Sequence, residues 1–139
     1  MRFFPFFIFL LSFSLYAAPT KLALVGKDSR SMSIVDQVAA NQALSGDFEF
    51  LERGMMDELI QEQKISDETL RQCFPHAELL GILSYVEDKR ITQKIPFEFQ
   101  VLDLNRGEIL VKKWFPDKKE GLLPEIIGCL KEANRKRNL

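Results

Sequence analysis

Few residues of this 139-residue chain are of the types that catalyse reactions or bind metal ions. There is one histidine, His76, and there are two cysteines, Cys73 and Cys129, neither of which belongs to a Cys-x-x-Cys motif. Catalytic and metal sites need several such groups at matched spacing, and the chain has no Gly-x-Ser-x-Gly, phosphate-loop or zinc pattern. The acidic residues within 57–62 lack converging partners, which favours a solvated helix face. We therefore expect a protein that is not an enzyme and uses no cofactor or metal.

The two cysteines have two interpretations. In an exported chain an even pair is compatible with a disulfide. A Cys73–Cys129 bridge would close a loop of about 56 residues and stabilise the fold by roughly 4 kcal/mol. Cysteine also packs well as a small buried hydrophobic side chain. The sequence leaves both interpretations open.

The first 17 residues follow the plan of a secretory signal peptide. Arg2 precedes the apolar segment 3–15, and Ala17 suits the position before cleavage. The segment is shorter than a membrane-spanning helix, no cysteine follows it as a lipidation site, and no later segment is apolar enough to span a bilayer. We therefore expect a signal peptide at 1–17. Residues 18–139 should then form a single soluble domain exported to the periplasm, without membrane insertion.

The charge of the chain excludes some classes of partner. With 19 basic and 20 acidic residues the net charge is −1, which gives no long-range attraction to nucleic acid or to an anionic membrane. The basic residues 135–137 complement the dipole of the helix that they are expected to end. Three charges alone bind lipid weakly. We expect neither nucleic acid nor a membrane surface as a partner.

Apolar periodicity predicts an α/β fold with the element order β-α-β-α-β-β-β-α. Five segments have the pattern of strands: 21–26, 48–53, 79–87, 95–103 and 108–115. Three have helical spacing: 33–44, with Ser31 or Ser33 as its cap, 55–64 and 122–134. Helix-length crossovers make the first strands parallel, whereas tight turns, one of them at 105–107, make the last three antiparallel. The product is a mixed five-stranded sheet with helices packed on it.

Four residues are candidates for binding a partner protein: Arg53, Lys112, Trp114 and Phe115. Arg53 stands at the carboxyl end of a strand, where it could bind a partner or form a structural ion pair. Along the last strand, Lys112 and Trp114 share one face and Phe115 lies on the other. Lysines on an edge strand discourage unwanted pairing, and an exposed tryptophan is an effective interface residue. The alternative is that Trp114 is buried under the last helix.

Four segments together carry a family resemblance. They are 50–53 (FLER), 59–63 (LIQEQ), 77–83 (AELLGIL) and 102–109 (LDLNRGEI). Their pattern resembles that of the curli-secretion (CsgG-like) lipoprotein family and its relatives. These relatives include the lipoprotein activators of penicillin-binding proteins and the N-terminal domain of the Tol-system periplasmic protein. Glu78 stands where the pattern usually has aspartate.

The resemblance implies an anticodon-binding-like α/β sandwich that is non-enzymatic and works by contact with another envelope protein. The pore function of the curli channel is not carried over, because the chain lacks a lipidation cysteine and room for extra hairpins. Glu98, Lys112 and Lys113 also argue against a lipid-facing barrel wall.

Two functional hypotheses follow. The first is a periplasmic adaptor or assembly factor that binds an envelope protein. The second is a module that binds a small molecule or glycan through the loops 27–31 and 53–55, at the carboxyl ends of parallel strands, where such sheets usually bind ligands. A pocket lined by Arg30 and Arg53 would favour the second. The sequence identifies neither the partner nor the oligomeric state, and a hydrolase ranks last for want of a nucleophile–base pair.

Overall fold

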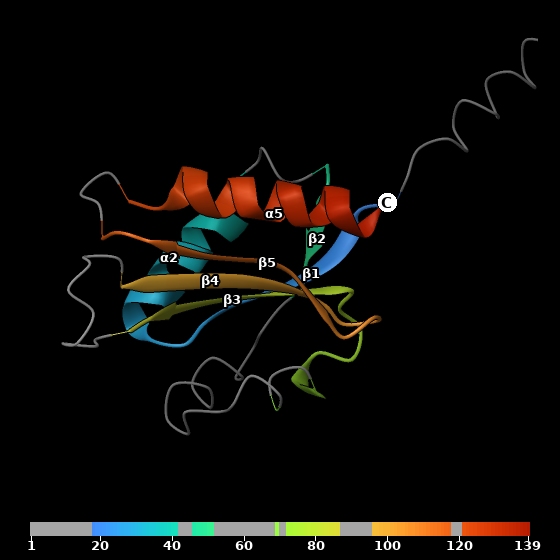
Figure 1. Cartoon of the computed structure of the whole chain (residues 1–139), viewed down its shortest axis with the longest axis horizontal. Helices are drawn as coiled ribbons and strands as arrows, with labels where there is room; N and C mark the ends of the chain where they lie inside the picture. Colours follow the sequence, from blue (N-terminus) through green and yellow to red (C-terminus); the bar gives the residue numbers. More distant parts are fainter. Residues whose placement is uncertain (1–17, 42–45, 52–68, 70–71, 87–95, 118–120) are drawn as a thin grey trace, which may run out of the picture.

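The computed structural model describes residues 18–41, 46–51, 69, 72–86, 96–117 and 121–139. Five strands form one sheet in the order β2-β1-β3-β4-β5 (Figure 1). Their bounds are β1 (Thr20–Gly26), β2 (Phe48–Phe50), β3 (Leu79–Tyr85), β4 (Phe97–Asp103) and β5 (Glu108–Phe115). β1 runs parallel to β2 and β3, whereas β3, β4 and β5 are antiparallel. The predicted mixed five-stranded α/β sheet is confirmed.

Two helices, α2 (Ser29–Ala39) and α5 (Leu123–Arg137), pack on the same face of the sheet. Both contribute to one buried apolar cluster with alternate residues of the central strands, among them Leu22, Phe99, Val101, Val35, Val38, Ile126 and Leu130. Figure 1 shows α5 running along the sheet above β5 and β4. The predicted last helix is confirmed, and it continues three residues past its expected end at 134.

The opposite face of the sheet has its own apolar cluster. It is formed by the intervening strand residues and by the segment before β3: Ala23, Val25, Leu80, Ile82, Leu102, Phe74 and Ala77. Cys73 packs against this second cluster, whereas Cys129 is buried in the first. Both thiols are free. The disulfide that the sequence left open is therefore absent, because the sheet separates the two side chains.

The start of α2 differs from the sequence prediction. The helix begins at Ser29 rather than near residue 33, and its N-cap is Asp28 rather than Ser31 or Ser33. The backbone of Asp28 is extended, and its carboxylate accepts hydrogen bonds from the Ser31 N–H at 2.8 Å and the Ser31 hydroxyl at 2.9 Å. An aspartate at this position satisfies N–H groups that the first helical turn leaves unpaired.

Gly26 lets β1 pass directly beneath this helix start. A Cβ atom at Gly26 would lie 2.3 Å from the backbone nitrogen of Met32 and 2.6 Å from its Cα. These distances are far inside van der Waals contact, so the close approach of strand and helix requires glycine.

Some sequence predictions fall outside the described residues. They are the signal peptide at 1–17, the helix at 55–64 and the candidate Arg53. Among the described residues, no helix has the length and apolar content needed to cross a bilayer.

Candidate interaction surface

β5 is the last strand of the sheet, and among the described residues its outer edge pairs with no other strand. Lys113 and Phe115 face α5: Lys113 bonds to that helix, and Phe115 packs against the helix-side cluster. Lys112 and Trp114 therefore face the other way, as the alternation predicted. Trp114 is 40% exposed, so the alternative that it is buried under the last helix is wrong.

The face of β5 that carries Trp114 has both apolar and charged side chains. Trp114 pairs in register with Glu98 of β4, and Glu98 forms an ion pair with Lys112 at 3.4 Å. Ile109, further along β5, is 50% exposed and lies on the same face, because it pairs with Leu102 of the second cluster. We call Ile109, Lys112 and Trp114 the tryptophan face. Its composition resembles the mixed apolar and charged character of protein interfaces.

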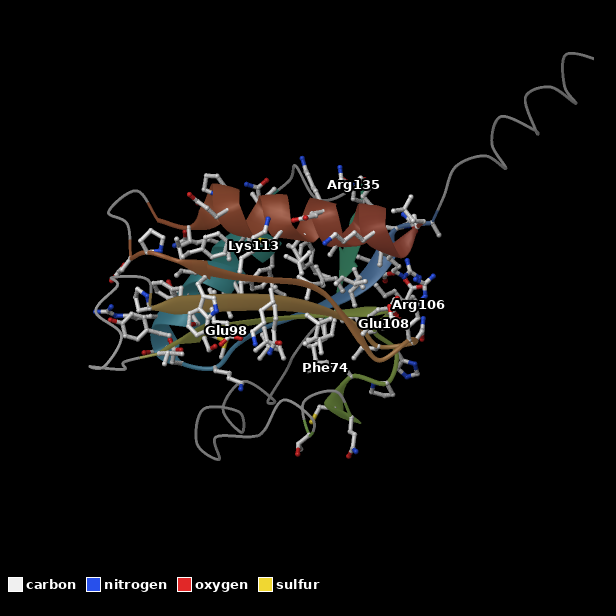
Figure 2. The ribbon with its side chains drawn as sticks, in the orientation of Figure 1. Phe74, Glu98, Arg106, Glu108, Lys113 and Arg135 are labelled. Carbon is white, nitrogen blue, oxygen red and sulfur yellow. The ribbon has the colours of Figure 1, made fainter. Side chains whose placement is uncertain are left out.

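The helix side of β5 is held by ion pairs. Lys113 Nζ lies 2.9 Å from Glu132 Oε2, and Lys136 Nζ lies 3.5 Å from Glu132 Oε1. Figure 2 shows Lys113 beside α5 and Glu98 on the other side of the sheet. The hydrogen bond from Lys113 lowers the pKa of Glu132, and the same bond raises the pKa of Lys113.

A shallow groove of about 500 Å³ lies beside the ion pair of Lys113 and Glu132. Its lining comes from β5 and from one side of α5: Lys113, Gly128, Lys131, Glu132 and Arg135. We call it the helix-side groove. Sequence reasoning missed it, because residues 128–135 line a groove only once α5 is placed beside the edge of β5.

In the described part of the ligand site predicted at the carboxyl ends of the parallel strands, the loop 27–31, Arg30 and Asp28 already have partners within the chain. Arg30 forms an ion pair with Asp117 at 3.1 Å, and its guanidinium lies 4.8 Å from the centre of the Tyr85 ring. Tyr85 in turn packs edge-to-face on Phe97 with ring centres 5.0 Å apart. Both oxygens of the Asp28 carboxylate already accept hydrogen bonds. Since Arg53 lies outside the described residues, the pair Arg30 and Arg53 is not brought together here.

A polar cluster joins the start of β1 to the end of α5. Arg137 donates to Glu78 Oε1 at 2.8 Å and to the Thr20 hydroxyl at 3.2 Å, and the other Glu78 oxygen accepts the Lys21 N–H at 2.8 Å. Thr20 also donates to Asn134 at 2.9 Å. Arg137 was expected only to complement the helix dipole, and its bond to Glu78 was missed because the two are 59 residues apart.

The residues with the greatest intrinsic reactivity are not assembled into a site. His76 is exposed in the turn before β3, and burial raises the pKa of the Cys129 thiol. Among the described residues, no three His, Cys, Asp or Glu side chains gather where they could hold a metal ion.

This chain is similar in fold to several solved structures. No protein-family model and no curated protein sequence matches the chain. Among solved structures, TolB from Acinetobacter baumannii matches with a TM-score of 0.53 at 12% identity, over 84% of this chain and 28% of TolB. The C-terminal domain of LpoB from Escherichia coli gives a TM-score of 0.45 at 14% identity, over 76% of this chain and 90% of that domain. Lipoprotein GNA1162 from Neisseria meningitidis gives 0.43 at 11% identity, over 81% and 94%.

At 12% identity the match to TolB shows a shared fold and nothing further. Of the three, the match to TolB exceeds a TM-score of 0.5, so the fold assignment rests on it. This chain spans just over a quarter of the length of TolB. The predicted likeness to the fold of the Tol-system protein is confirmed, whereas the likeness to the curli-secretion family stays a prediction.

Proposed function

We propose that this chain is a periplasmic adaptor or assembly factor that binds another protein of the bacterial envelope and catalyses no reaction. The observation that carries the proposal is the exposure of Trp114 on an edge strand. A tryptophan is costly to leave in water, and truncating a central tryptophan is among the most damaging changes at protein interfaces.

The surroundings of Trp114 support the same function. Lys112 and Glu98 form an ion pair beside it, and Ile109 extends the exposed apolar surface along β5. An apolar centre with charged neighbours is the composition of a protein-binding patch. Glu98 and the lysines of β5 also fit a curli-secretion-like domain without the membrane pore.

The ligand-binding alternative has less support. Arg30 is held by Asp117 and Tyr85, and both oxygens of the Asp28 carboxylate are used in capping α2 and in binding β3. The contacts of Arg30 and Asp28 within the chain account for their positions without a ligand. We therefore do not propose a small-molecule or glycan site at this end of the sheet.

The test is affinity capture of the tagged chain from its own cell envelope, followed by mass spectrometry. Trp114→Ala is the test variant, and Gln37→Ala, an exposed position on α2, is the matched control. We expect the wild-type chain and the control to retain the same envelope protein, and Trp114→Ala to bind it at least about tenfold more weakly. Capture of no envelope protein by the wild-type chain contradicts the proposed function.

Export is checked separately. The chain in the periplasmic fraction should begin at residue 18, as measured by intact mass. Recovery of the full-length chain from the cytosol contradicts the periplasmic assignment.

A further inference from the structure

The outer edge of β5 has backbone groups available for pairing. Among the described residues β5 pairs with one strand, β4, which lies along its inner edge. At one end of this edge the Leu110 carbonyl already accepts a hydrogen bond from Lys136 Nζ at 3.1 Å. The stretch from Val111 to Phe115 stays available for pairing, and an extended chain could add to it as a sixth strand.

The helix-side groove determines which charge such a strand would carry on one face. Lys113, Lys131 and Arg135 give the groove three positive charges against the single negative charge of Glu132, although the whole chain has a net charge of −1. Lys131 and Arg135 are exposed and form no ion pair with another described residue. Acidic side chains therefore complement this groove.

Gly128 determines how much space the groove offers. It lies within α5 and lines the groove, and a Cβ atom added there would meet no atom within 4 Å. Glycine inside a helix costs about 1 kcal/mol relative to alanine. Its absence of a side chain leaves open space between α5 and the edge of β5, where incoming side chains fit.

The face of β5 that points away from α5 determines which side chains an added strand would carry on its second face. Side chains of an added strand alternate between two faces. Those facing away from α5 would lie beside Trp114, which is 40% exposed and offers an apolar surface.

We propose that the β5 edge binds an extended segment of a partner protein in which acidic and apolar side chains alternate, the acidic ones in the helix-side groove and the apolar ones against Trp114. This proposal rests on the proposed function and specifies its partner. A second copy of the chain fits poorly, because two β5 edges would bring their own Lys112 and Lys113 side chains together.

The experiment uses synthetic peptides as probes and the fluorescence of Trp114, the single tryptophan of the chain. The test probe is a peptide of about ten residues that alternates Glu and Val, a length typical of a strand. Control probes replace Glu by Lys, or place a proline at the centre, which removes a backbone donor. Anionic phospholipid vesicles test whether the groove binds negative charge in any form.

Two pairs of variants test the geometry. Gly128→Leu should fill the groove and weaken binding of the Glu–Val peptide at least about tenfold, whereas Gly128→Ala should bind normally, and both should fold because they favour the helix. The double substitution Lys131→Gln with Arg135→Gln should weaken binding about fivefold. The control Lys21→Gln, at an exposed lysine on β1, should bind normally.

We expect the Glu–Val peptide to shift the Trp114 emission and to lose affinity as salt is added, and we expect the Lys and proline probes not to bind. Three results overturn the proposal. The proline probe binds as tightly as the Glu–Val peptide, Gly128→Leu binds the Glu–Val peptide as tightly as wild type, or the chain binds the vesicles and does not bind the peptide. If an envelope protein is captured and the Glu–Val peptide does not bind, the proposed function stands and the β5 edge is excluded. If the peptide binds and no envelope protein is captured, the edge stands and the proposed function fails.

Discussion

The carboxylate of Asp28 accepts the backbone N–H of Tyr85 at 2.8 Å, which joins the start of α2 to the end of β3 across 57 residues. The same carboxylate caps α2 through Ser31. One side chain therefore fixes the first helix against the central part of the sheet, beside the close approach at Gly26.

Replacing Asp28 by alanine should destabilise the protein by about 1–3 kcal/mol. The substitution removes the helix cap and leaves the Tyr85 N–H without its acceptor. Asp28→Asn keeps one of the two oxygens and should lie between alanine and wild type. Urea denaturation measures the differences, and a change of less than about 0.5 kcal/mol for Asp28→Ala contradicts this role.

Replacing Gly26 by alanine should be at least as damaging, with a loss of about 2 kcal/mol or more, because the added Cβ meets the backbone of Met32. Gly128→Ala is the matched control, since its Cβ meets open space and alanine favours the helix by up to about 1 kcal/mol. Thermal unfolding of the two variants should give changes of opposite sign. Equal melting temperatures would show that β1 can move away from α2.

The ion pair between Lys113 and Glu132 should make stability depend on pH. The pKa of Glu132 is lowered from its ordinary value of 4.5, so the pair stabilises the fold above that value and is lost as the pH falls through the lowered pKa. The pKa of Lys113 is raised from 10.5, so its contribution is complete below that value and is lost as the pH rises through the raised pKa. Glu132→Gln should therefore melt slightly lower than wild type at about pH 7, and the difference should vanish at about pH 2. If the difference in melting temperature between Glu132→Gln and wild type is the same at about pH 2 as at about pH 7, the effect comes from packing and not from the ion pair.

The cysteines should behave as two free thiols of unequal reactivity. Cys129 is buried and its pKa is raised by burial, whereas Cys73 is half-buried. In the native protein, alkylation without reductant should modify Cys73 faster, and unfolding should expose both. A mass that shows both cysteines unmodified after unfolding without reductant, and both alkylated once reductant is added, would show that the disulfide forms.

Local patterns in the sequence predict the antiparallel part of the fold well. The alternation along 97–103 and 111–115 fixes which side chains share a face, and Gly107, with φ of 67°, closes the turn between these strands. The register shift opposite Val101 and Leu102, which puts Ile109 on the face of Lys112 and Trp114, does not follow from alternation. The separation of Trp114 from Phe115 onto opposite faces follows from that alternation alone. Whether Trp114 is exposed depends on where α5 packs, which its own sequence does not specify.

Contacts between distant residues are what the sequence patterns could not predict. Ser31 and Asp28 are both good caps by residue type, and Asp28 is used because it also binds Tyr85. Likewise, Glu78 and Arg137 meet only because β3 begins at the same end of the sheet at which α5 ends. The helix-side groove has the same origin.

The most direct test of the central claim is photo-crosslinking in living cells, with a photoreactive amino acid at position 114 and, as the control, at Gln37 on α2. If Trp114 marks the surface that binds an envelope protein, position 114 should give one discrete crosslinked product containing that protein, and position 37 should not. Discrete crosslinks from position 37 with none from position 114 would contradict the assignment of β5 as the binding surface.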